Sequence, residues 1–138
     1  MSLVYGEHYP LPLPDDLFGQ LCDRLGGEKR VIAVAHFTLK TAQESPPIIE
    51  MPIKSVSQLV ICSFVASNAG NVVTARDMQE FGMPLGPDTR DDLALVRKNI
   101  KRLNDRGLGI KPQGSRHERT YLIPEIREAS LQYVEDPA

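Results

Sequence analysis

The sequence predicts an α+β fold in which amphipathic helices and short antiparallel strands share one core. Three observations support this prediction. Apolar residues recur every three or four positions in several segments, two stretches alternate as strands do, and glycine- and proline-rich connections separate these segments. With 138 residues, 41% of them hydrophobic and 25% charged, the chain is most simply one compact domain that needs no metal or disulfide for its stability.

Residues 1–54 are predicted to form an arm, a helix and a β-hairpin that pack on the rest of the chain. Met1 to Leu13 contains several prolines and no periodicity, which indicates an extended arm. Pro14-Asp15-Asp16 starts a helix that ends at Gly26-Gly27. Val31 to Leu39 and Ile48 to Ile53 are the two strands, and Pro52 places the second one at a sheet edge or a strand end because it cannot donate a ladder hydrogen bond.

Residues 55–138 are predicted to form the core, and this part begins with a capping box. Ser55 with Gln58 three residues later opens a helix that is apolar nearly all round, as expected at the centre of a core. Val72-Val73 can form a minimal strand. Thr74 with Asp77 caps a short helix that ends at Phe81, and the segment from Gly82 to Asp88 is a loop.

The next helix begins at Thr89 and ends before Gly107. Its apolar residues lie on one side at spacings of three and four: Leu93, Val96, Ile100 and Leu103. Ile110 to Gln113 and Arg119 to Ile123 are predicted to pair as a hairpin, and Pro112 makes the first of these an edge strand. A final helix is expected from Glu125 to Val134, burying Ile126, Ala129 and Tyr133.

The charge of the chain is distributed unevenly. Residues 1–96 contain 7 Lys/Arg and 12 Asp/Glu, residues 97–120 contain 8 and 2, and residues 121–138 contain 1 and 4. A block of charge +6 therefore lies within a chain whose total charge is −2. Because this block coincides with one helix and the following hairpin, it predicts an anion-binding surface. The alternative is a solvated face whose charges pair locally, for example Arg102 with Asp105 or Arg119 with Glu118.

Several classes of function find no support in the sequence. Cys22 and Cys62 lie in apolar patterns without ligand spacing, which indicates buried thiols rather than a disulfide or a metal site. No nucleophile with a base, no metal-ligand cluster and no phosphate-cradling glycine loop is found, so we expect neither an enzyme nor a cofactor. No apolar run has the length of a membrane helix and no signal sequence is found, so we expect a cytoplasmic protein.

From about Ile48 to Ile123 the pattern resembles the winged helix-turn-helix domain of OmpR/PhoB-type response regulators. The resemblance rests on the strands leading into Ser55-Val56-Ser57-Gln58-Leu59, the turn from Asn68 to Thr74, Asn99-Ile100-Lys101-Arg102-Leu103, and the hairpin ending in Thr120-Tyr121-Leu122. It implies a helix in the DNA major groove, a hairpin or wing at the minor groove or backbone, and a loop, Gly82 to Asp88, that touches RNA polymerase. The chain departs from the family because it contains no receiver domain and no glycine before Tyr121.

The sequence thus predicts a winged helix-turn-helix with a three-helix core, a β-hairpin wing, an N-terminal helix with antiparallel strands, and a C-terminal helix. Arg97 and Lys101 are the candidates for contact with bases in the major groove. The other candidate DNA-binding residues are expected on the backbone, at the wing or at a helix start: Arg90, Lys98, Arg102, Lys111, Arg116, His117, Arg119 and Thr74.

Two functions from different classes follow from these observations. The first is sequence-specific binding of double-stranded DNA by a transcriptional regulator, which would form a homodimer through its terminal helices. The second is a protein-protein interaction module, an adaptor or assembly factor, that keeps the winged-helix shape without binding DNA. The acidic balance outside the basic block and an outward-facing Leu95 favour the second function.

Overall fold

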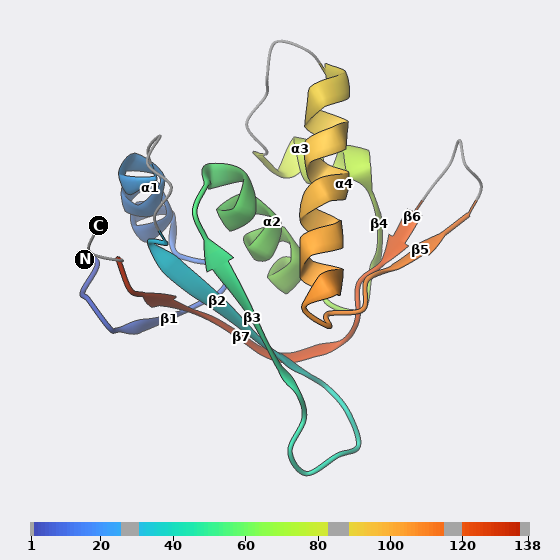
Figure 1. Cartoon of the computed structure of the whole chain (residues 1–138), viewed down its shortest axis with the longest axis horizontal. Helices are drawn as coiled ribbons and strands as arrows, with labels where there is room; N and C mark the ends of the chain where they lie inside the picture. Colours follow the sequence, from blue (N-terminus) through green and yellow to red (C-terminus); the bar gives the residue numbers. More distant parts are fainter. Residues whose placement is uncertain (1, 26–30, 83–88, 115–119, 136–138) are drawn as a thin grey trace.

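The computed structural model describes residues 2–25, 31–82, 89–114 and 120–135, and the side chains of residues 75, 79, 82 and 89–95 are not described. The described residues form four helices and two antiparallel sheets (Figure 1). Their order is β1 (His8–Pro10), α1 (Asp15–Arg24), β2 (Ala33–Leu39), β3 (Ile48–Ile53), α2 (Val56–Ser67), β4 (Val72–Thr74), α3 (Ala75–Gly82), α4 (Thr89–Asp105), β5 (Lys111–Gln113), β6 (Thr120–Leu122) and β7 (Ile126–Tyr133). The predicted α+β class is therefore confirmed.

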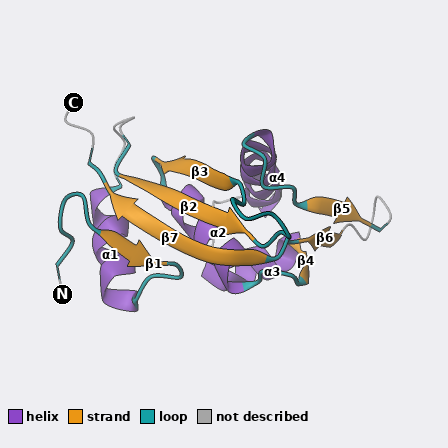
Figure 2. Ribbon diagram, turned by 90° about the horizontal axis from the view of Figure 1, so that it is seen from below, coloured by secondary structure: helices purple, strands orange, loops and turns teal. Residues whose placement is uncertain are grey.

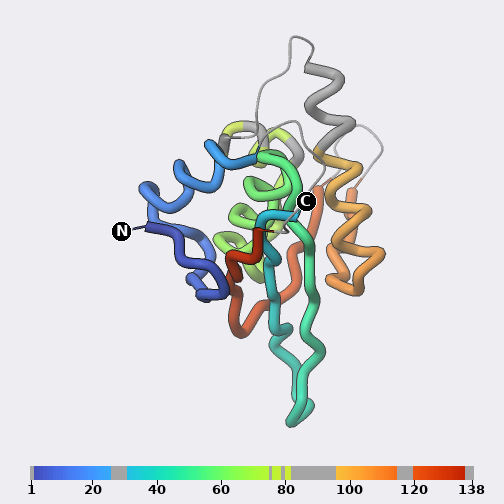
Figure 3. Tube along the Cα trace, turned by 60° about the vertical axis from the view of Figure 1, so that its left-hand side comes forward, coloured from blue at the N-terminus to red at the C-terminus, as the bar shows by residue number. Residues whose placement is uncertain are grey.

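The larger sheet has the strand order β1-β7-β2-β3. Its inward residues alternate along each strand, as Ala33, Ala35 and Phe37 do in β2, and all three are fully buried. Helices α1 and α2 cover this inner face, whereas Figure 2 looks onto the opposite face, which no helix covers. β3 lies at the edge of the sheet, as Pro52 predicted. The connection from β2 to β3 projects away from the rest of the molecule (Figures 1 and 3).

The predicted C-terminal helix, Glu125 to Val134, is wrong: Ile126 to Tyr133 forms strand β7. Ala129 and Tyr133 fit helical spacing, but together with Leu131 they also fit the two-residue period of a strand. β7 pairs antiparallel with β1 on one side and with β2 on the other. The two partner strands give the backbone N–H and C=O groups of β7 hydrogen-bond partners. A helix of this length is only marginally stable without tertiary packing, so pairing as a strand is favoured.

The N-terminal segment is also more integrated than an extended arm. Its residues His8 to Pro10 form β1, and Leu3, Leu11 and Leu13 belong to the core. At the other end of this segment, Arg24 of α1 donates a hydrogen bond of 2.5 Å to the Tyr133 hydroxyl at the end of β7. Residues from both predicted parts, 1–54 and 55–138, therefore share one sheet and one core.

The central helix α2 forms as its sequence predicts. The Ser55 hydroxyl accepts the N–H of Gln58 at 3.3 Å, which satisfies a donor at the helix start. Nine of its residues, Ser57 to Val65, are buried. Burial raises the pKa of the Cys62 thiol in this helix to about 12, so Cys62 is a packed and protonated core residue, and it forms no disulfide with the second cysteine.

Candidate nucleic-acid interface

Helix α4 is held against the core by one apolar side. Val96, Ile100 and Leu103 are buried there, and α4 packs against both α2 and α3. Because these three residues are spaced by four and three positions, they fix the rotation of the helix about its axis. The intervening positions 97, 98, 101 and 102 are consequently exposed, and all four carry positive charge.

The end of α4 is tied to the start of the small sheet. The Asn104 side chain accepts the N–H of Ile110 at 2.7 Å and donates to the carbonyl of Ile110 at 2.9 Å. Gly107, with a φ of 101°, makes the turn between these residues. A two-bond clamp of this kind sets the position of β5 and β6 relative to the helix. The small sheet has the order β4-β6-β5, so β5 is an edge strand, as Pro112 predicted.

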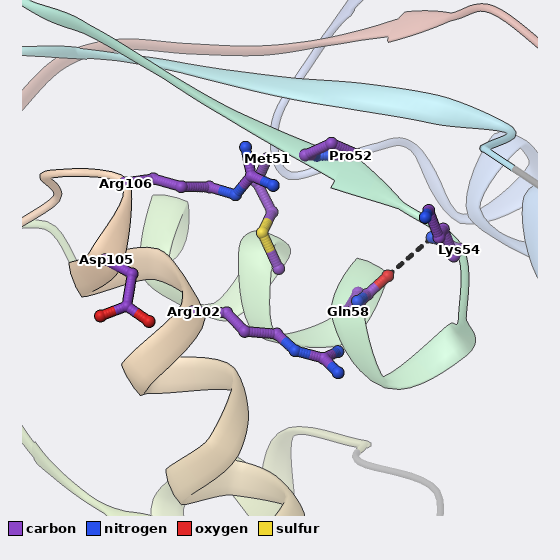
Figure 4. Close-up of a pocket in the computed structure, with 7 residues that line it drawn as sticks. All are labelled: Met51, Pro52, Lys54, Gln58, Arg102, Asp105 and Arg106. Carbon is purple, nitrogen blue, oxygen red and sulfur yellow. Dashed lines mark hydrogen bonds between the residues drawn. The ribbon is translucent and has the colours of Figure 1, made fainter.

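The four cations of α4 whose side chains are described divide between two flanks of the helix. Arg97 and Lys101 precede Asn104 by seven and three positions, so they share its flank, the one clamped to the small sheet. Arg102 lies on the opposite flank, where it lines a cavity with residues of β3 and the start of α2 (Figure 4). Lys98 lies on the outermost part of the helix. Of the predicted DNA-binding residues, these four thus lie on one helix, but their side chains do not point in one direction.

Of the two predicted local ion pairs, only Arg102 with Asp105 lies in the described part of the chain; Arg119 and Glu118 lie outside it. Arg102 and Asp105, both described, form no ion pair; instead the Arg102 side chain extends toward Gln58 (Figure 4). Likewise, no ion pair joins Arg97, Lys98 or Lys101 to another described residue. Asp105 is an exposed carboxylate on the same face, and it weakens the positive field at the end of the helix.

The predicted wing residues are described only in part. Lys111 is exposed on β5, and Tyr121 on β6 is buried as a core aromatic. The backbone of Arg90 lies in α4, but its side chain is outside the description. Arg116, His117 and Arg119 lie outside the described residues, as do residues 83–88 of the predicted polymerase loop, Gly82 to Asp88. Gly82 itself is the last residue of α3. The outward direction of Leu95 is outside the description as well.

Thr74 is a poor candidate for phosphate binding. Its N–H donates to the Asp77 carboxylate at 2.8 Å, and its hydroxyl accepts the N–H of Asp77 at 3.1 Å. This arrangement is the predicted capping box, so the cap itself is confirmed. Because it uses the backbone donors and places a negative charge at the start of α3, it opposes a phosphate there.

Sequence reasoning missed three residues beside Arg102. Lys54, Gln58 and Arg106 line the same cavity, which has a volume of about 490 Å³. Arg106 lies in the basic block of residues 97–120, so the charge pattern of the sequence could have identified it as a candidate. Lys54 and Gln58 lie at the capped start of α2, and the sequence pattern there indicated a helix cap but no binding site.

Comparison of the chain with protein-family models, with curated proteins and with solved structures gave no match. Among the described residues, no three His, Cys, Asp or Glu side chains gather as a metal site would require. No described helix has the length and apolar character needed to cross a membrane.

Proposed function

We propose that this chain binds double-stranded DNA as a winged helix-turn-helix protein, with α4 in the major groove and the β5–β6 hairpin as the wing. The order of elements supports this proposal: α2, α3 and α4 pack against one another, β4 lies between α2 and α3 in sequence, and the hairpin follows α4. In winged helices the third helix of this order is the one that reads bases.

One observation carries the proposal: the exposed side of α4 presents Arg97, Lys98 and Lys101 without an ion-pair partner among the described residues. Long, unpaired cations on a helix that protrudes from the core suit both phosphate oxygens and guanine acceptors. Arg97 and Lys101 share the flank nearest the hairpin, so they are proposed to enter the groove. Lys98 and Lys111 are proposed to contact the backbone.

The proposed biological role is transcriptional regulation in the cytoplasm, with two copies on adjacent half-sites. The predicted dimer through both terminal helices needs revision, because the C-terminal segment is β7 and already pairs with β1 and β2. Of the two predicted terminal helices, α1 is the one that forms. A dimer would therefore use α1 or another surface.

A salt titration of binding to a mixed-sequence duplex, followed by fluorescence anisotropy, tests the proposal. Several phosphate contacts predict a log-log slope of about −4 to −6, with about −0.9 for each contact. Lys101→Ala should weaken binding, whereas Lys40→Ala, a matched change at the start of the projecting β2–β3 connection, should not. Absence of binding to any duplex at low salt would contradict DNA binding.

An exposed aromatic side chain beside a partly apolar cavity favours the second candidate, a protein-protein interaction module. Phe81 at the end of α3 is 44% exposed and packs edge-on against Phe64, with ring centroids 5.3 Å apart. Phe81 also lines a cavity beside α1, whose other lining residues are Pro12, Leu13, Asp15, Phe18, Ser63 and Ser67. An exposed aromatic next to apolar side chains is typical of protein contacts. Phe81→Ala should leave duplex binding unchanged if DNA is the partner of this chain.

A further inference from the structure

We infer that the cavity between β3, the start of α2 and the end of α4 is an oxyanion pocket that takes a phosphate group. This inference goes beyond the proposed function, because the cavity lies on the flank of α4 opposite to Arg97 and Lys101. Its lining residues are Met51, Pro52, Lys54, Gln58, Arg102, Asp105 and Arg106 (Figure 4).

The orientation of the Gln58 amide is fixed by the backbone. Its Oε1 accepts the N–H of Lys54 at 2.7 Å, which leaves the NH₂ group of the amide to donate to other partners. Gln58 is only 7% exposed, and no bond to this NH₂ group is formed by the described residues. A nearly buried donor therefore stands at the inner wall of the cavity.

The charged groups of the cavity are mostly cations. Lys54, Arg102 and Arg106 contribute three positive charges, and Asp105 contributes one negative charge. Arg106 is held in place because its Nη1 donates to the carbonyl of Glu50 in β3 at 3.2 Å, which leaves its remaining N–H groups for a ligand. Figure 4 shows Asp105 at the opposite end of the opening from Gln58 and Lys54.

These donors suit a tetrahedral oxyanion better than a carboxylate or a neutral ligand. Two guanidinium groups and an ammonium group supply charge, and the Gln58 amide supplies a neutral donor for a third or fourth oxygen. Lys54 and Gln58 bring the start of α2 to the wall of the same cavity. The phosphate group can belong to a free ligand or to a DNA strand that passes α4 on this flank.

Gln58→Glu is the decisive variant. Glutamate keeps the oxygen that accepts the Lys54 N–H and is a favourable residue at this helix position, so the fold should persist. It replaces the donor NH₂ by a negative charge. We expect wild-type protein to bind inorganic phosphate saturably at constant ionic strength, and Gln58→Glu and Lys54→Met to weaken it about tenfold or more. Lys40→Met is the matched control and should bind as the wild type does.

The measurements are ³¹P NMR titration with inorganic phosphate and anisotropy with the duplex, on the same variants, with circular dichroism as the check of folding. Weaker phosphate binding with unchanged duplex affinity supports the pocket and assigns it to a free phosphate ligand. Weaker binding of both supports the pocket and assigns it to a DNA phosphate. Phosphate binding without any duplex binding supports the pocket and contradicts the proposed function. Equal phosphate affinity in wild type and Gln58→Glu, or no saturable phosphate binding, overturns the pocket.

Discussion

The two sheets of this protein differ in how they are built. The strands β2, β3 and β7 of the larger sheet are six to eight residues long and share a buried face with α1 and α2. The strands of the small sheet have three residues each, and all three residues of β5 are exposed. The cations proposed to contact DNA, Arg97, Lys98, Lys101 and Lys111, lie on α4 and the small sheet. The longest strands and the basic block of residues 97–120 therefore lie in different parts of the chain.

The largest expected effect belongs to the core of the larger sheet. Phe37 in β2 is fully buried. Phe37→Ala should lower the free energy of unfolding by about 3–5 kcal/mol, because the cavity left by the ring cannot fill completely. Urea unfolding followed by circular dichroism measures this change. A loss below about 1 kcal/mol would mean that the larger sheet is not the main source of stability.

A pH effect on stability should also arise in the core. Burial raises the pKa of Cys62 from 9.0 to about 12, so the folded state holds its thiol proton more tightly than the unfolded state does. This contribution is fully present below pH 9 and is lost as the pH rises toward 12. Unfolding free energies of wild type and Cys62→Ala, measured from pH 8 upward, should therefore converge with pH. Parallel curves would place the thiol in contact with water.

A smaller effect is expected where α4 meets the core. Asn99 is fully buried, and neither atom of its amide has a hydrogen-bond partner among the described residues. An unsatisfied buried amide costs about 1–3 kcal/mol, so Asn99→Leu should raise the free energy of unfolding by roughly that amount or leave it unchanged. Thermal melting checks this result. A marked loss of stability would show that the amide is bonded in the folded protein.

The smallest effect on stability is expected at the edge of the small sheet. Lys111 on β5 is exposed, and Lys111→Ala should change the free energy of unfolding by less than about 0.5 kcal/mol. If it contacts a phosphate, the same variant should reduce the salt slope of duplex binding by about 1. A large loss of stability at Lys111 would remove the distinction between the two sheets.

Local patterns in the sequence were sufficient for helices with clear signals. The Ser55 cap and the Thr74–Asp77 box depend on residues three apart, and both form as predicted. The buried side of α4 follows in the same way from Val96, Ile100 and Leu103, and the exposure of its cations follows from that side. Such features depend on contacts within one or two turns, which the order of residues specifies directly.

The tertiary structure alone decided the features that depend on distant partners. Ile126 to Tyr133 fits both a helix and a strand, and the open positions beside β1 and β2 selected the strand. The cavity beside α4 joins Lys54 and Gln58 with Arg102 and Arg106, which are more than 40 positions later in the chain. Periodicity determined which side of α4 is buried, because that depends on neighbours in sequence. The contacts between buried sides, and the cavities at their edges, depend on packing between segments that are far apart in the chain.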